Sequence, residues 1–255
     1  MNKAFILLAL IMSTSIAFAN PGQYQINQAC INVGCFSGDN PATSTIEITQ
    51  AAGTFVLTSN LIISNNENGV PAISVSSASN DSAVVIDLNG YTISHTGIAS
   101  AGTDGIEVAG INSVVTVRNG MISGFQDGIH SAEGATLVVE DMVFRINRDD
   151  AIQLNRGYIR DNVFQSNAYG IYVLLGPNGA GNEQLGERVF IDSNLFLDAD
   201  GSQDALNSVS DTSYCKDNVI AYLDTGNLGA CSLSGQNLCD SSPCTVNRSF
   251  DAVKD

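Results

Sequence analysis

The amino-acid sequence predicts an all-β protein, a right-handed parallel β-helix of one domain with disulfides pinning its ends. Two sets of short motifs repeat through the middle of the chain at one shared spacing. Apolar and polar residues alternate over runs of three to six residues, and no longer helical stripe interrupts them. The chain contains 24 Gly and no Trp, and many of its other residues are Val, Ile, Ser, Thr and Asn. This composition suits short strands separated by tight turns.

The first residues of the chain have the features of an export signal. Lys3 supplies a positive charge, residues 5–12 are apolar, and residues 17–19 read Ala-Phe-Ala, a typical cleavage site. The apolar run is shorter than the roughly 20 residues that span a bilayer. We therefore expect residues 1–19 to be a signal peptide and the mature protein to be secreted, periplasmic or extracellular, with no membrane span.

The rest of the chain fits one domain with a cap at each end. We expect an N-terminal cap over residues 20–45, a β-helix over 46–222 and a Cys-rich C-terminal cap over 223–255. Lys and Arg number 10 against 26 Asp and Glu, for a formal net charge of −16. Because binding to nucleic acid depends on basic side chains that neutralise phosphates, nucleic acid is not an expected partner.

The cysteines gather near the two ends of the chain, and an even number in an exported protein predicts disulfides. No His lies near them, so a zinc site is the weaker alternative. We expect Cys30 to pair with Cys35 and the other four to form two further disulfides whose pairing the sequence does not fix. The six residues are Cys30, Cys35, Cys215, Cys231, Cys239 and Cys244.

The first repeated motif places an Ile two residues after an Asp or Tyr. Its four copies are Asp104-Gly-Ile-Glu-Val, Asp127-Gly-Ile-His-Ser, Asp150-Ala-Ile-Gln-Leu and Tyr169-Gly-Ile-Tyr-Val. Their isoleucines are 23, 23 and 19 residues apart. Stacked coils about 4.8 Å apart would place these isoleucines in one interior column.

A second set of motifs interleaves with the first. Each motif ends in a large apolar residue, and these residues are Ile122, Phe144, Phe164, Phe196 and Ile220. Periods of about 20 to 30 residues also occur in leucine-rich and helical repeats. The short alternating runs exclude helical repeats, and the chain lacks a Leu ladder. One coil per period is therefore expected.

Three stretches extend the repeat pattern and carry a resemblance to a known group. They are Ile48-Thr-Gln-Ala-Ala-Gly-Thr-Phe-Val-Leu-Thr-Ser-Asn-Leu, Val85-Ile-Asp-Leu-Asn-Gly-Tyr-Thr-Ile-Ser and Val115-Thr-Val-Arg-Asn-Gly-Met-Ile-Ser-Gly-Phe. Over roughly residues 45–222 the chain resembles bacterial secreted right-handed β-helix repeat proteins of the pectate-lyase-like superfamily. The resemblance implies a carbohydrate role, since related folds include pectin and alginate lyases, polygalacturonases and uronate epimerases. Fold alone does not assign an activity.

Alternation along the first motif turns one polar side chain per coil outward. The resulting column holds Glu107, His130, Gln153 and Tyr172, beside the small residues Gly105, Gly128, Ala151 and Gly170. One interpretation is a shallow groove in which Glu107, Gln153 and Tyr172 bind substrate. The alternative is an ordinary solvated sheet face.

Beside that column, Asp104, Asp127 and Asp150 stack at the turns that lead into the strands. Each Asp could accept hydrogen bonds from amides of its own turn. The three could instead hold a hard cation such as Ca²⁺, which is the one cofactor that the sequence offers. An exposed column of carboxylates needs no help, but a half-buried one needs a cation or a proton.

Four of the basic residues, Arg145, Arg148, Arg156 and Arg160, fall within sixteen positions. Arg148 and Arg156 could bind the carboxylates of an acidic glycan. Alternatively, the cluster forms ion pairs with nearby acids, which are Glu140, Asp141, Asp149, Asp150 and Asp161.

His130 is the best candidate for a general base, because its predicted neighbours are Asp127 and Asp150. These three residues form the candidate catalytic set. An ordinary surface histidine is the alternative. The chain has no Gly-x-Ser-x-Gly elbow, no His-Glu-x-x-His motif and no phosphate loop.

Two functions from different classes remain. The favoured one is a non-catalytic extracellular or cell-surface module that interacts with polysaccharide, because enzymes of this fold build clefts from long loops and this chain has few. The alternative is a polysaccharide lyase or glycoside hydrolase that acts on an acidic glycan at the outer face.

Overall fold

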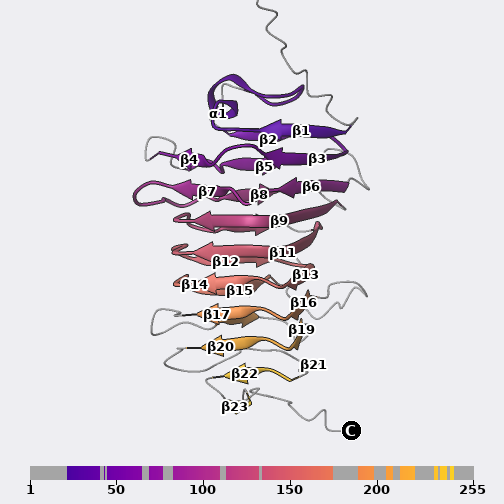
Figure 1. Ribbon diagram of the computed structural model, residues 1–255, viewed down its shortest axis with the longest axis vertical. Helices are drawn as coiled ribbons and strands as arrows, with labels where there is room; N and C mark the ends of the chain where they lie inside the picture. Colours follow the sequence, from indigo (N-terminus) through magenta and orange to yellow (C-terminus); the bar gives the residue numbers. More distant parts are fainter. Residues whose placement is uncertain are drawn as a thin grey trace, which may run out of the picture.

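The computed structural model is an all-β protein with almost no helix (Figure 1). It describes residues 22–40, 43, 45–64, 69–76, 83–109, 113–131, 134–174, 189–197, 205–208, 213–221, 233–234, 236–239 and 242–243. The predicted signal peptide, residues 1–19, lies outside these ranges. The described helix is the four-residue α1 (Cys30–Val33), near β1 at one end of the molecule.

Over the described residues the strands form two sheets, one of 16 strands and one of seven. The larger sheet runs through β1 (Gln23–Ile26), β3 (Ala52–Leu57), β6 (Ala83–Asp87), β9 (Val114–Ser123), β11 (Thr136–Arg145), β14 (Val163–Gln165), β17 (Leu195–Leu197), β20 (Val219–Ala221), β22 (Leu238–Cys239) and β23 (Ser242–Pro243). Beside this path lie β4 (Leu61–Ile63), β7 (Thr92–His95), β13 (Gly157–Arg160), β16 (Val189–Asp192), β19 (Ser213–Lys216) and β21 (Leu233–Ser234). The smaller sheet contains β2 (Ile46–Ile48), β5 (Ile73–Val75), β8 (Ile106–Val108), β10 (Ile129–Ser131), β12 (Asp150–Leu154), β15 (Tyr169–Val173) and β18 (Leu206–Ser208).

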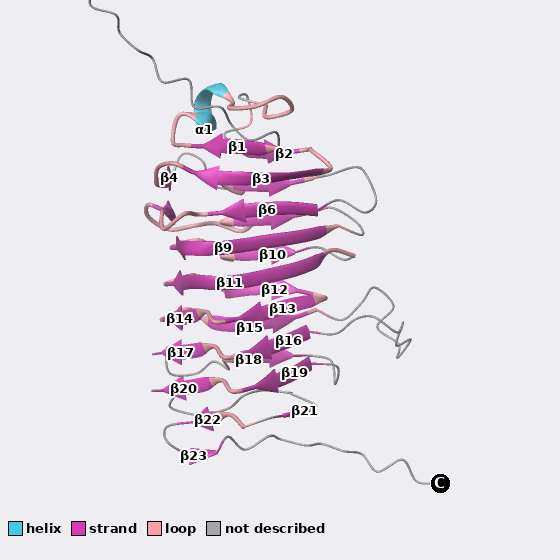
Figure 2. Ribbon diagram, turned by 45° about the vertical axis from the view of Figure 1, so that its right-hand side comes forward, coloured by secondary structure: helices cyan, strands magenta, loops and turns pink. Residues whose placement is uncertain are grey.

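The chain alternates between the two sheets along its length. From β8 it passes to β9 in the larger sheet, returns to β10, crosses to β11 and returns to β12. One run of the chain through both sheets is here called a layer. Each layer adds strands parallel to those of the layer before, and Figure 2 shows the layers stacked in sequence order. The described pairs are parallel except that of β22 with β23. Each layer is therefore stabilised mainly by its two neighbours.

The predicted isoleucine column is confirmed. Ile106, Ile129, Ile152 and Ile171 are register partners in successive strands of the seven-stranded sheet, and all are fully buried. Burial of one such side chain contributes roughly 2 kcal/mol. The column therefore accounts for much of what holds adjacent layers together.

The second predicted column is confirmed as well. Ile122, Phe144, Phe164, Phe196 and Ile220 follow one another in register across the larger sheet and are buried. The three phenylalanine rings stack, with centroids 5.3 and 4.6 Å apart. The two columns belong to one buried hydrophobic core that runs through the described strands of both sheets.

Asparagines line one corner of the layers and bond to one another. The side-chain oxygen of Asn194 accepts from both the backbone N–H and the Nδ2 of Asn162, at 3.0 Å each. Asn218 does the same for Asn194, and Asn237 for Asn218, again at 3.0 Å. We call these four residues, Asn162, Asn194, Asn218 and Asn237, the asparagine ladder.

The residues that precede Asn162, Asn194 and Asn218 have the left-handed backbone conformation. Asp161, Ser193 and Asp217 have φ values of 57°, 56° and 53°. This conformation turns the chain sharply, and Asp and other small polar residues adopt it more readily than most. The turn leaves a buried amide group facing the next layer, and the ladder satisfies it.

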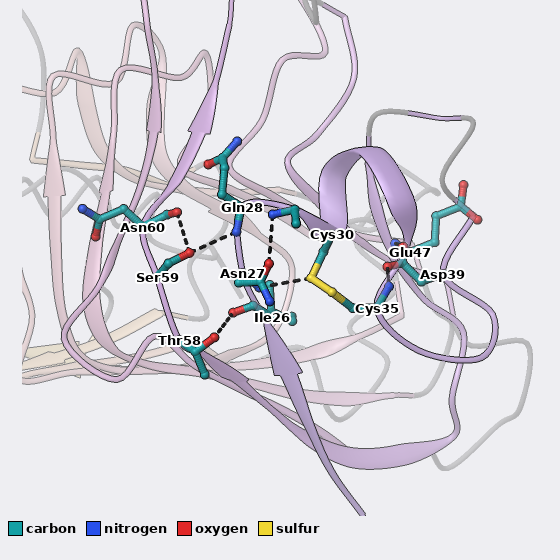
Figure 3. Close-up of a disulfide and its surroundings, with 11 residues drawn as sticks. Ile26, Asn27, Gln28, Cys30, Cys35, Asp39, Glu47, Thr58, Ser59 and Asn60 are labelled. Atoms are coloured by element: carbon teal, nitrogen blue, oxygen red, sulfur yellow. Dashed lines mark hydrogen bonds between the residues drawn. A yellow bond between two sulfur atoms is a disulfide. The ribbon is translucent and has the colours of Figure 1, made fainter. Parts of the chain in front are cut away.

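The N-terminal end is tied down by the predicted disulfide between Cys30 and Cys35 (Figure 3). Asp39 accepts from the backbone N–H of Cys35 at 2.8 Å and of Glu47 at 3.0 Å. Because Glu47 lies in β2, this carboxylate fastens the segment to the first layer. Cys215 is also disulfide-bonded, and no described cysteine is free; Cys231 and Cys244 lie outside the described residues.

The boundaries predicted for the two caps remain predictions. Strand β1 in the first cap and strands β21, β22 and β23 in the second all join the larger sheet. Pairing therefore extends beyond residues 46–222 at both ends. Among the described residues, no helix is long and apolar enough to cross a membrane.

Candidate functional site: a recess on the seven-stranded sheet

The outward column lies where the alternation placed it. Glu107 is the register partner of His130, His130 of Gln153, and Gln153 of Tyr172. All four side chains are partly exposed, while the residues on either side of each are buried. They come from β8, β10, β12 and β15, so one face of the seven-stranded sheet presents them in a line.

The aspartates lie where the chain enters these strands. Asp104 and Asp127 stand two residues before β8 and β10, and Asp150 is the first residue of β12. Their exposed fractions are 4, 5 and 7%. The column is thus buried, and adjacent ionised carboxylates about 5 Å apart would repel by about 3 kcal/mol at an effective dielectric constant of 20.

Asp127 has a bond that links two layers. Its Oδ1 accepts from the backbone N–H of Asp150 at 3.0 Å. The predicted bonds from each Asp to the amides of its own turn are not what the structure gives here, because the accepted amide belongs to the following layer. In a parallel stack, the nearest free amide lies in the next layer.

The outward column and the aspartate column meet in a recess of about 400 Å³. The recess is lined by Gly102, Asp104, Gln126, Asp127, His130, Asp149, Asp150, Gln153, Tyr169 and Tyr172. The candidate catalytic set of Asp127, His130 and Asp150 is therefore brought together. Gln153 and Tyr172 line the recess too, whereas Glu107 lies outside the lining.

His130 stands among the carboxylates. Its Nδ1 is 3.5 Å from Oδ2 of Asp104 and 3.9 Å from Oδ2 of Asp127. The hydrogen bond to Asp104 raises the pKa of the imidazole, against the effect of burial. When it is protonated, the imidazolium offsets part of the negative charge that the aspartates concentrate there.

Burial separates the proton affinities of two of the aspartates. It raises the pKa of Asp150 to about 8, helped by the charges of Asp127 and Asp149. Burial also raises the pKa of Asp127 to about 6, but the amide of Asp150 stabilises its ionised form. Asp150 therefore holds its proton more firmly than Asp127 at neutral pH.

Two buried carboxylate oxygens in the recess have no hydrogen-bond partner among the described residues. They are Oδ1 of Asp104 and Oδ1 of Asp150. A buried acceptor without a donor costs about 1–3 kcal/mol, and more when it is charged. Among the described residues, the recess therefore offers these two oxygens neither a hydrogen-bond donor nor a cation.

One subset of the lining has the spacing of a metal site. Asp104, Asp127 and His130 each offer one ligand atom, and the three atoms lie within 4.8 Å of one another. Asp150, which the sequence grouped with Asp104 and Asp127 as calcium ligands, is not part of this set. His130 takes its place.

The small residues beside the outward column have a different role from the one predicted. A Cβ at Gly128 would lie 2.5 Å from the carbonyl oxygen of Ala151 and 2.8 Å from Phe144, and Gly105 is equally crowded by Ile122. They permit close packing against the interior of the larger sheet. The recess owes its depth instead to the turns before the strands.

The predicted basic patch does not form the wall of the recess. Arg148 is exposed, and its Nη1 donates to the carbonyl oxygen of Ala99. Arg156 donates from Nη2 to the carbonyl oxygen of Gly134 at 2.9 Å. Of the predicted ion pairs, the described residues show that of Arg160 with Glu140. Neither Arg148 nor Arg156 lines the recess.

Tyr169 and Gln126 were not among the residues predicted for the site. Tyr169 is the register partner of Asp150 and closes the aspartate column. The repeat itself carried this signal, since Tyr169 occupies the position of the Asp in the fourth copy of the motif. Gln126 precedes Asp127, and no repeat in the sequence marks it as a site residue. Its side-chain oxygen accepts a hydrogen bond from the N–H of Gly102 at 3.0 Å.

No protein-family model, no curated protein and no solved structure matches the chain.

Proposed function

We propose that this chain is an exported right-handed parallel β-helix protein of the pectate-lyase-like kind, and that its recess binds a polysaccharide. The chain path supports the fold, because each layer returns to the seven-stranded sheet in parallel register. In this view the protein is a non-catalytic extracellular or cell-surface module.

The observation that carries the binding proposal is that three members of the outward column, His130, Gln153 and Tyr172, line one open recess from three successive strands. Carboxylates, Gln153 and the two tyrosine hydroxyls can bond to sugar hydroxyls. The rings of Tyr169 and Tyr172 add apolar area for the faces of sugar rings. A chain of sugars laid across the strands would meet these groups layer by layer.

The charge of the recess favours a neutral glycan over an acidic one. Four aspartates line it, and the lining contains no Lys or Arg. An acidic glycan would meet like charge on a protein whose formal net charge is already −16. The acidic polysaccharide expected from the arginine cluster therefore becomes the less favoured ligand.

The test is retention of the purified mature protein in affinity electrophoresis through gels that contain neutral glycans, pectate or alginate. We expect retardation by a neutral glycan, and its loss in Tyr172→Ala and Gln153→Ala. Glu107→Gln is the matched control, since it alters the same outward column outside the recess. Arg148→Glu and Arg156→Glu should also bind normally.

If the arginine variants alone lose retention, the glycan binds at the basic cluster and the recess proposal is wrong. Retention by no glycan of either kind would overturn the carbohydrate proposal as a whole.

Glycoside hydrolysis is the second candidate, because one recess holds two carboxyl groups of unlike proton affinity. Glycosidases use one protonated carboxylic acid and one carboxylate. Asp150 would donate the proton and Asp127 would be the ionised partner. We would measure new reducing ends from any glycan that binds: Asp150→Asn should abolish their release while retention persists. Binding with no release by the unaltered protein would leave the non-catalytic function.

A further inference from the structure

We propose that Asp104, Asp127 and His130 bind a divalent transition-metal ion of the zinc type at the mouth of the aspartate column. The proposal does not depend on glycan binding, because it rests on the donor atoms of the recess alone. It also differs from the calcium site expected from the sequence, in both its residues and its metal.

The first argument is the identity and spacing of the donor atoms. Imidazole nitrogen and carboxylate oxygen are common zinc ligands, at bond lengths of about 2.0–2.2 Å. Two ligands of a tetrahedral ion at such bond lengths are about 3.4 Å apart. The Nδ1 of His130 is 3.5 Å from Asp104 and 3.9 Å from Asp127.

The same distances fit direct hydrogen bonds less well. An N–H···O bond normally has its heavy atoms 2.7–3.2 Å apart, roughly. At these distances the hydrogen bond of His130 to Asp104 is a long one, and both carboxylates lie near the right distance for a cation shared with the imidazole.

The second, independent argument is an oxygen that lacks a donor. Asp104 is 4% exposed and lines the recess, and its Oδ1 has no partner among the described residues. Asp150, 7% exposed, has a second such oxygen in the same recess. Buried charges are normally paired or coordinate metals. A cation held by these ligands compensates the charge of Asp104.

The donor set favours a transition metal over calcium. Ca²⁺ takes about six to eight oxygen ligands in a flexible shell. The compact set here contributes one nitrogen and two carboxylates, and imidazole suits Zn²⁺ and its neighbours. Three protein ligands would leave a fourth position open toward the recess.

The test uses the purified mature protein after chelation and dialysis, with no glycan present. Titration calorimetry with Zn²⁺ should detect one tight site per chain that is tighter than any for Ca²⁺. Co²⁺ in its place should give the visible absorption of a tetrahedral ion. Asp104→Asn, which is isosteric, and His130→Gln, which removes the imidazole nitrogen, should each weaken Zn²⁺ binding at least about 100-fold, the upper range for loss of outer-shell partners alone.

Two control variants separate coordination from simple attraction to negative charge. Asp149→Asn removes the same charge from the same recess but lies outside the ligand set, so binding should weaken far less than in Asp104→Asn. Glu107→Gln should bind Zn²⁺ as the unaltered protein does. Circular dichroism of each variant checks that the sheets are intact.

Three results would overturn the proposal: no stoichiometric Zn²⁺ binding, Ca²⁺ binding as tight as Zn²⁺, or equal losses in Asp104→Asn and Asp149→Asn. None of them bears on glycan retention, which is measured separately in chelated protein. The two proposals can therefore fail independently.

Discussion

Three carboxyl groups of this protein are buried where the chain enters strands of the seven-stranded sheet. They belong to Asp104, Asp127 and Asp150, which are 4, 5 and 7% exposed. Asp149, one residue away from Asp150, is partly exposed. A shift of one residue along the chain thus decides whether a carboxyl group is buried in the aspartate column.

The stability of the metal-free protein should depend on pH through Asp150. Burial raises its pKa to about 8 in the folded protein, from an ordinary value of 3.8. The folded state therefore binds the proton more tightly than the unfolded state. The stability that this provides is full below about pH 4 and is lost as pH rises through about 8.

The variant Asp150→Asn should remove that dependence. At pH 9 we expect the variant to unfold at a higher denaturant concentration than the unaltered protein. Its free energy of unfolding should be larger by at least about 1 kcal/mol, since a tenfold change in proton affinity is worth about 1.4 kcal/mol. At pH 4 the two should be nearly equal. Urea unfolding in the presence of a chelator measures both, and parallel pH profiles for the two proteins would contradict the burial of Asp150.

At the scale of elements, the corner that carries the asparagine ladder is joined from layer to layer by hydrogen bonds, as the strands are. Asn194 makes four side-chain hydrogen bonds: it accepts two from Asn162, and its Nδ2 donates to Asn218 and to the carbonyl oxygen of Ile159. Each step of the asparagine ladder repeats this arrangement. The ladder fastens β13 and β14 to β16 and β17 at the point where the chain turns.

Replacement of Asn194 by Ala should therefore destabilise the protein by about 2–4 kcal/mol, because it leaves buried donors of Asn162 without an acceptor. Gln165→Ala is the matched control: this side chain is partly exposed at the end of β14, and its loss should cost less than about 0.5 kcal/mol. Denaturant unfolding followed by circular dichroism compares them. Equal effects would mean that the amide groups contribute little.

The sequence predicted the strands better than the corners. Ile129 and Phe144 belong to columns that repeat in the sequence, and apolar alternation fixes which way they point. The Asn residues repeat too, after Asp161, Ser193 and Asp217. Their hydrogen bonds, however, join layers 19 to 32 residues apart and exist only once the layers are stacked.

Prediction of the site was limited in the same way. Alternation placed His130, Gln153 and Tyr172 on the outer face. It could not give the burial of Asp104, which depends on the turns above and below. Nor could it reveal that Arg148 and Arg156 donate to backbone carbonyl oxygens, because the alternation of apolar and polar residues does not determine the conformation of a long side chain.

For the molecule as a whole, the disulfides at its ends should leave no free thiol. Thiol titration of the denatured but unreduced mature protein should detect none, whereas prior reduction should release six. The disulfide of Cys30 with Cys35 and the bonded state of Cys215 are the basis for this expectation. A reactive thiol in the unreduced sample would show that one of the distal cysteines is unpaired.

The repetition of the asparagine ladder also bears on how such a molecule can change in length. Asn194 meets Asn162 on one side and Asn218 on the other through bonds of the same kind. A tandem duplication of the gene segment for that layer would set each new Asn between two suitable partners. The layers of β16 to β20 contribute nothing to the recess, so growth there would leave it intact. An insertion between Asp104 and Asp127 would split it, so we expect lengthening to be tolerated in the layers of β16 to β20 and to disrupt the recess in the middle of the stack.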